Sequence, residues 1–167
     1  MNVEQMRELF TYNGWANRRI FEALGALPVE DYMRDLKCSF ASIHGTIAHI
    51  VSAERLWLSR WRGETGVTLQ KGSDFASLAE VRKLWDQVEG DRGKYLARLT
   101  PSQLESEITI RPTAGGQFVH TVRETMLHTV DHSSYHRGQI VTMLRQVGVK
   151  PPATGLIGFY RERSKAA

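Results

Sequence analysis

Apolar residues recur at spacings of three and four through four long stretches of the chain, which predicts four amphipathic helices. Each stretch ends at or just before glycine or proline, the residues that most often stop a helix. The expected helices cover about residues 3–27, 42–62, 75–100 and 122–147. Four long helices joined by short connections favour a helical bundle.

The remaining segments are shorter. Residues 31–40 are expected to be a connection, and residues 156–163 a short C-terminal helix. Ile108 to Ile110 and Gln117 to Val119 flank a turn that contains Pro112, Gly115 and Gly116, a pattern typical of a short β-hairpin. The predicted fold is therefore all-α, a four-helix bundle formed by one domain over residues 1–167, with a hairpin before the last long helix.

Composition narrows the class of protein. Hydrophobic residues at 41% and charged residues at 24% are ordinary for a globular protein, and no stretch is apolar enough for a membrane span. The net charge of +4 raises the possibility of nucleic-acid binding, but the basic residues are scattered and no nucleic-acid module is visible. Cys38 is the single cysteine, and the first residues lack the features of a secretory signal. We expect a cytoplasmic protein.

Histidine is the residue type with the most regular pattern. Of six histidines, His128, His132 and His136 recur every fourth residue along the last predicted helix, so that neighbouring rings lie one above another. Neutral imidazole is the commonest side-chain ligand of transition metals. On a helical wheel His136 lies within the apolar stripe, His132 at its edge and His128 rotated outward, so His132 and His136 are the better candidates for an inward-facing pair.

A third protein ligand must come from another helix, and the second predicted helix offers His44 and His49. Both lie at similar angles from its apolar face, so the wheel does not separate them. His132 and His136 also have an alternative interpretation, as histidines at the edge of the core that are hydrogen-bonded to backbone carbonyls or carboxylates.

Several motifs resemble the DinB branch of the DinB/YfiT-like superfamily, whose members are metal-binding four-helix proteins. The resemblance covers nearly the whole chain. It is carried by Tyr12–Asn17 (YNGWAN), Phe40–Ile50 (FASIHGTIAHI), Glu54, Trp57, and most specifically His128–Ile140 (HTVDHSSYHRGQI), followed by Leu144, Arg145 and Gly148.

That resemblance implies a ligand set and a topology. In the family one ligand comes from the second helix and two from the last, which implies His49, His132 and His136 in this chain. It also implies an up-down-down-up order of helices, and many members are homodimers. One departure is Gly155, because many close relatives carry an aspartate at that place.

Three imidazoles leave open positions on a metal, an arrangement typical of catalytic rather than structural sites. The expected function is that of a metal-dependent enzyme that activates a low-molecular-weight thiol, as an S-transferase does, or water. The alternative is a stress-related metal-binding protein without turnover. Zinc and nickel are the favoured metals, with iron, manganese and copper as alternatives.

No general base is evident from the sequence. Glu54, Asp131 and Tyr135 are candidates for orienting a ligand through its other ring nitrogen. Alternatively, Glu54 and Asp131 are solvated charges on helix faces. Arg137 and Gln139 have no assigned role, and the expected partners are a small-molecule substrate, such as a thiol, and a second copy of the chain.

Overall fold

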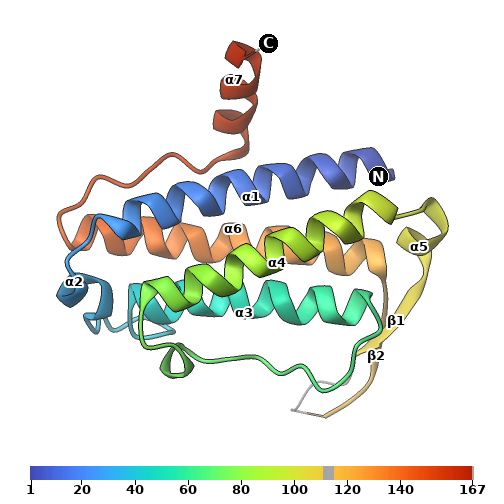
Figure 1. The fold of residues 1–167 in the computed structure, drawn as a ribbon, viewed down its shortest axis with the longest axis horizontal. Helices are drawn as coiled ribbons and strands as arrows, with labels where there is room; N and C mark the ends of the chain where they lie inside the picture. The colour runs from blue at the N-terminus through green and yellow to red at the C-terminus, as the bar shows by residue number, and fades with distance from the viewer. Residues whose placement is uncertain (111–114, 167) are drawn as a thin grey trace.

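Four long helices form the body of the protein, which is described here by a computed structural model over residues 1–110 and 115–166. These helices are α1 (Val3–Gly25), α3 (Ile43–Trp61), α4 (Leu78–Arg98) and α6 (Val122–Gln146) (Figure 1). Each begins or ends within about three residues of the position that the hydrophobic pattern predicted. The predicted four-helix bundle is confirmed.

The helices run in the order up, down, down and up. Helices α3 and α4 point the same way because the segment 62–77 leads the chain back along the length of the bundle before α4 begins (Figure 1). Around the bundle, α1 packs on α6, α6 on α3, α3 on α4, and α4 on α1. This topology places α3 and α6, the two histidine-bearing helices, side by side.

Polar side chains set the starts of the long helices. The side-chain oxygens of Asn2, Ser42, Ser77 and Thr121 each accept a hydrogen bond from the backbone N–H three residues on. Such caps satisfy N–H groups that have no partner inside the helix, and each stabilises a helix by about 1 kcal/mol. Asn2 and Thr121 also form capping boxes with Gln5 and Glu124.

Three short helical segments were not expected from the sequence. Residues Val29–Met33, which overlap the expected connection, form α2, and a further turn, η1, covers Gly72–Asp74. Pro101 lies just beyond α4, as the pattern predicts, and it also starts a short helix that was not expected, α5 (Pro101–Glu105), because proline suits a first helical turn and Thr100 caps it. The expected C-terminal helix is present as α7 (Leu156–Ala166).

The predicted hairpin is also present. Strands β1 (Glu107–Ile110) and β2 (Phe118–Thr121) pair antiparallel, with Ile108 opposite His120. Pro112, which was assigned to the turn, lies outside the described residues. Strand β2 leads directly into α6, since Thr121 is both the last residue of the strand and the cap of the helix. The hairpin therefore determines where α6 begins.

The core has two apolar halves with a polar layer between them. One half surrounds Ile20, Ile47 and Ile140, and the other surrounds Met6 and Met126. At the middle of the bundle the buried side chains are polar instead: Asn13, Asn17, Glu54, Arg92, Ser133 and Arg137. These six residues are called the polar layer below. The apolar halves supply the burial that stabilises the fold, and the polar layer fixes the register of the helices.

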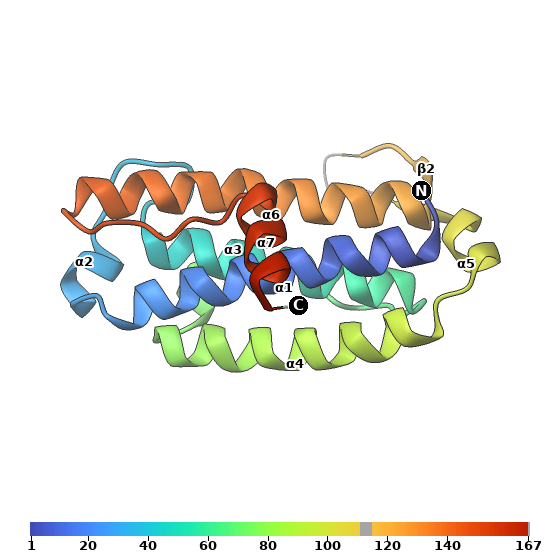
Figure 2. The same cartoon turned by 90° about the horizontal axis from the view of Figure 1, so that it is seen from above.

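Helix α7 crosses α1 at a steep angle and projects from the bundle (Figures 1 and 2). Phe159 packs against Tyr12 and Trp15 of α1, and the Trp15 Nε1–H donates to Glu162. Tyr12 also donates to the Thr154 carbonyl, just before Gly155. These contacts attach the C-terminal segment to the bundle.

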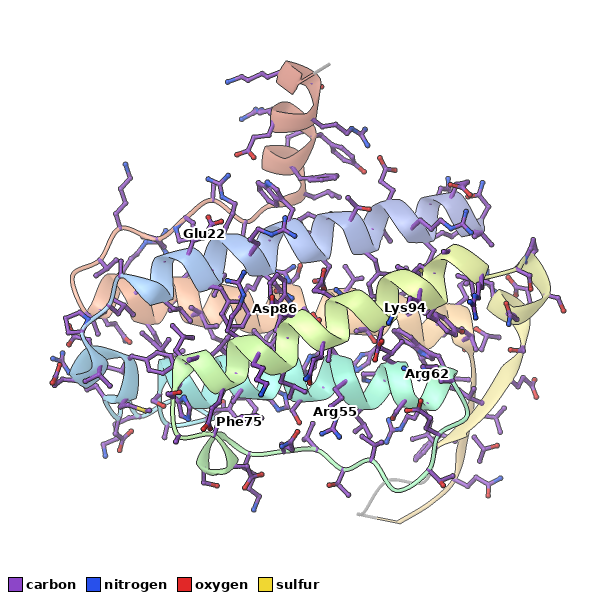
Figure 3. The ribbon with its side chains drawn as sticks, in the orientation of Figure 1. Glu22, Arg55, Arg62, Phe75, Asp86 and Lys94 are labelled. Carbon is purple, nitrogen blue, oxygen red and sulfur yellow. The ribbon has the colours of Figure 1, made fainter. Side chains whose placement is uncertain are left out.

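Charged side chains such as Glu22, Asp86 and Lys94 are exposed on the outer faces of α1 and α4 (Figure 3). Among the described helices, none combines the length and the hydropathy that crossing a lipid bilayer requires.

Candidate metal centre

Three histidines from two adjacent helices meet in the bundle. His49 lies on α3, and His132 and His136 lie one turn apart on α6. One ring nitrogen of each lies within 4.8 Å of the others, and the Nε2 atoms of His49 and His132 are 2.9 Å apart. Within residues 1–110 and 115–166, these residues form the one group of at least three His, Cys, Asp or Glu side chains that can hold a metal ion. We call this group the histidine centre.

His44, the other candidate on α3, forms hydrogen bonds outside the histidine centre. Its Nε2–H donates to the carbonyl of Gly72 at 2.8 Å, and its Nδ1 accepts from the Tyr32 hydroxyl at 2.8 Å. A carbonyl can only accept, so this pattern assigns the proton to Nε2. With both ring nitrogens engaged, His44 holds the η1 turn and α2 against α3. The structure thus separates His44 from His49, which the helical wheel left open.

The outward rotation expected for His128 is confirmed, because its side chain is exposed. Its ring lies edge-on to Trp57, with ring centroids 5.3 Å apart, and 5.7 Å from the ring of His132. His120, at the end of the hairpin, is half-buried. Neither residue belongs to the histidine centre.

Neighbouring side chains orient the rings of the centre. The Nδ1 of His136 lies 2.8 Å from the Gln139 side-chain oxygen, which can only accept, so Nδ1 carries the proton and Nε2 keeps its lone pair. Phe40 stacks on His49 at 4.0 Å between centroids and meets His136 edge-on at 5.3 Å. Gln139 and Phe40 therefore restrict two of the three rings.

Close packing between Phe40 and α3 explains why position 45 is a glycine. A Cβ atom added at Gly45 would lie 2.1 Å from the Phe40 carbonyl oxygen, well inside van der Waals contact. The chain then turns at Ala41, whose φ of 63° is left-handed. A side chain at position 45 would push Phe40 away from His49.

Burial keeps the imidazoles neutral. It lowers the pKa of His49 to about 4, with a smaller contribution from the charge of His136. Burial, followed by the charges of His136, His49 and His128, lowers the pKa of His132 to about 3. Both rings are neutral at pH 7, and only the neutral ring has a lone pair for a metal. Three imidazole nitrogens that face one another fit a divalent transition metal.

Glu54 does not have either role expected for it. It is 1% exposed, so the interpretation as a solvated charge is wrong, and its hydrogen bonds go to the polar layer instead of a histidine ring. Asn13, Asn17 and Ser133 donate to Oε1, and Arg92 donates to Oε2. Burial raises the pKa of this carboxyl, but Arg92 and the other donors outweigh burial and keep it lowered.

The two remaining candidates lie on the exposed side of α6. Asp131 is exposed, in agreement with a solvated charge. Tyr135 is 65% exposed, and its ring meets His136 edge-on at 5.1 Å. Gln139, to which the sequence assigned no role, is the residue that contacts a histidine nitrogen; its position three residues after His136 was the available signal.

A cavity of about 510 Å³ adjoins the centre on the side of His49. Phe40, Leu69 and the η1 residues Gly72 and Ser73 belong to its wall, and Lys71 is the one charged residue among the described residues that line it. The η1 segment is held in place because the Gln70 N–H donates to Ser52 at 2.5 Å. The volume suits a small molecule.

The fold and the site together define the class of protein: an up-down-down-up four-helix bundle with three facing histidines on its second and last long helices. The chain matches the DinB family over residues 1–164 and belongs to it. It is 30% identical to protein DinB of Bacillus subtilis (strain 168) over 95% of this chain and 96% of that protein. It is also 23% identical to the uncharacterized protein YizA of the same organism, over 92% and 94% of the two chains.

Solved structures show the same fold. A DinB-like protein from Bacillus cereus ATCC 10987 matches with a TM-score of 0.66 at 19% identity, over 91% of this chain and 97% of that one. YfiT from Bacillus subtilis, described as "a probable metal-dependent hydrolase with an unusual four-helix bundle topology", matches with a TM-score of 0.64 at 14% identity, over 90% and 91%.

Proposed function

We propose that this DinB-family protein is a metal-dependent enzyme that transfers a low-molecular-weight thiol to an electrophile, with His49, His132 and His136 as the ligands of one divalent metal ion. The observation that carries the proposal is the set of three facing nitrogens beside a cavity of about 510 Å³. Three protein ligands leave coordination positions for a substrate, whereas structural sites are closed by four. Zinc and nickel are the proposed metals.

A bound divalent ion would supply a Lewis acid that lowers the pKa of a thiol, so that the thiol loses its proton to solvent at neutral pH. The residues of the chain have three tasks in this scheme. The histidines hold the ion, Gln139 and Phe40 fix the direction of the rings, and the cavity beside His49 receives the electrophile. A separate general base is not required, because the ion itself favours the thiolate.

Water is the second candidate nucleophile, since a bound water is also acidified by such an ion. YfiT is described as a probable metal-dependent hydrolase, so hydrolysis by a metal-bound water is tested alongside thiol transfer. Its fold is the same, but fold alone does not define a reaction. A small-molecule substrate, a homodimeric state and a cytoplasmic location stay predictions.

The test is conjugation of cellular thiols to monochlorobimane by protein loaded with zinc or nickel. We expect fluorescent conjugate above the uncatalysed rate for at least one thiol, lost in His49→Ala and His136→Ala. The matched control is His128→Ala, an exposed histidine of the same helix outside the centre, assayed after full metal loading. Hydrolysis of ester and amide substrates without thiol conjugation would favour water, and tight metal binding without either reaction would favour a non-catalytic, stress-related role.

A further inference from the structure

Side chains that can bind a metal recur at every fourth residue along the first four turns of α6 and the end of β2. They are His120, Glu124, His128, His132 and His136. Residues four apart are neighbours on a helix, and each step of four turns by about 40°, so the members on α6 form a row that winds from the exposed to the buried side of the helix. The last two belong to the histidine centre. The first three lead towards it from the hairpin end of the bundle and have no part in the proposed reaction.

The outer residues line a cavity of their own. His120, Glu124 and His128 surround a space of about 300 Å³ together with Trp57, Ile110 and Thr125. Among the described residues of its wall, Glu124 carries the one formal charge, and this negative charge attracts a cation. The His120 Nδ1 lies 3.7 Å from the Glu124 carboxylate, which shows that neighbouring members of the row come close to one another.

Exposure falls along the row towards the centre. Glu124 and His128 are exposed, His132 is half-buried, and His136 is 7% exposed. The ring centroids of His128 and His132 are 5.7 Å apart, and those of His132 and His136 are 4.4 Å apart. With metal–nitrogen bonds of about 2.1 Å, one ion can contact two rings at these separations before it leaves the first.

We propose that Glu124 and His128 form an entry site for a divalent transition metal, from which the ion passes to His132 and into the histidine centre. A hydrated ion must lose several waters to reach a buried site. Along this row each water is replaced by one protein ligand, and neither the charge of the ion nor any covalent bond of the protein changes. The Trp57 ring lies nearly perpendicular to the His128 ring and restricts its rotation. The inference rests on the metal centre proposed above.

Kinetics distinguish an entry site from a solvated helix face. Apoprotein is mixed with Co²⁺ by stopped flow, uptake is followed by the visible absorption of the bound ion, and release is driven by excess chelator. In His128→Ala we expect uptake to slow by about tenfold, which corresponds to about 1.4 kcal/mol in the barrier. Release should slow by the same factor and the equilibrium affinity should stay the same, because the final ligands are intact.

Two further variants sharpen the test. Glu124→Gln keeps the capping box with Thr121, because glutamine serves at that position, and should slow uptake without unfolding the helix. Asp131→Asn removes an exposed charge of α6 outside the row and should leave both rates unchanged.

The proposal is overturned if His128→Ala takes up Co²⁺ as fast as the unmodified protein. It is also overturned if the variant binds more weakly at an unchanged uptake rate, because His128 would then be a ligand of the filled centre. If the unmodified protein binds no Co²⁺, the proposed metal centre itself is wrong. This outcome is seen without any variant and is therefore distinct from failure of the entry site. A variant with normal helicity and slowed uptake and release supports the entry site.

Discussion

Two groups of polar side chains lie within the bundle, and they differ in how their polar atoms are satisfied. In the polar layer both oxygens of Glu54 accept hydrogen bonds, from Asn13, Asn17, Ser133 and Arg92. Arg137 donates to the side-chain oxygens of Asn13 and Asn17, at 2.6 and 2.8 Å. In the histidine centre, by contrast, ring nitrogens face one another across 2.9 Å.

The difference separates a structural group from a chemical one. A buried polar network whose members have complementary partners rigidifies the fold, and loss of one partner leaves a desolvated charge. Facing imidazoles are all of one chemical kind, and their lone pairs are complementary to a cation. We therefore expect substitutions in the polar layer to change stability and substitutions in the histidine centre to change metal binding.

The largest effect is expected for the ligands themselves. In His49→Ala the metal content should fall from about one ion per chain to near zero, because two imidazoles hold a divalent ion loosely. The matched control is His44→Ala on the same helix. It should keep its metal but lose about 1–3 kcal/mol of stability, because Tyr32 and Gly72 lose a buried partner. Elemental analysis and urea denaturation measure the two quantities, and equal metal loss in both variants would contradict the assignment.

Next in size is removal of the carboxylate of the polar layer. Glu54→Ala leaves buried Arg92 with only the partly exposed Glu89 as an ion-pair partner and removes the negative charge that stabilises buried Arg137. It should lower the free energy of unfolding of the apoprotein by about 3–5 kcal/mol. Urea denaturation without metal measures it. Exposed Glu22→Ala on α1 serves as the control and should change stability by less than about 0.5 kcal/mol. A destabilisation as small as that of the control would show that the network does not hold the helices together.

A smaller change is expected when the centre loses its orienting hydrogen bond. Gln139→Ala frees the Nδ1 of His136 and should weaken metal binding by about 10–100-fold, with little change in the stability of the apoprotein. Gln139→Glu keeps an acceptor at the same place and should restore most of the affinity. Calorimetric titration with zinc compares the two variants, and equal affinity in all three proteins would remove Gln139 from the centre.

The smallest effect is a pH dependence of apoprotein stability. Burial holds the pKa values of His49 and His132 at about 4 and about 3, whereas unfolded histidine titrates near about 6.5. Below about pH 6.5 the unfolded chain binds protons that the folded chain does not, so stability falls with decreasing pH, through the folded pKa of His49 and then that of His132.

The window between about pH 6.5 and 5 isolates these histidines, since the lowered pKa of Glu54 places its contribution at more acidic pH. Urea midpoints of the apoprotein at pH 7 and pH 5 measure the slope. It should be shallower in a protein with both His49→Ala and His132→Ala, and an identical slope in that variant would mean that the two rings are not held neutral.

Much of the fold follows from local sequence. The spacing of apolar residues predicts four helices, and the predicted starts near residues 42 and 122 agree with the caps that Ser42 and Thr121 form. Local signals were incomplete where one residue has two roles: Pro101 follows the end of α4, as predicted, and also starts α5, which was not predicted. The histidine row on α6 and the outward position of His128 also follow from helical period alone, because both depend on a single element.

The sequence alone determined which helix carries the two paired histidines and which of its histidines faces outward, because these are properties of one helix and its period. Tertiary structure decided what needs two or more elements at once. It engaged both nitrogens of His44 with Tyr32 and Gly72, set His49 opposite His132, and buried Glu54 among three other helices. Distances between helices depend on how side chains far apart in the sequence pack, and helical period carries no information about that packing.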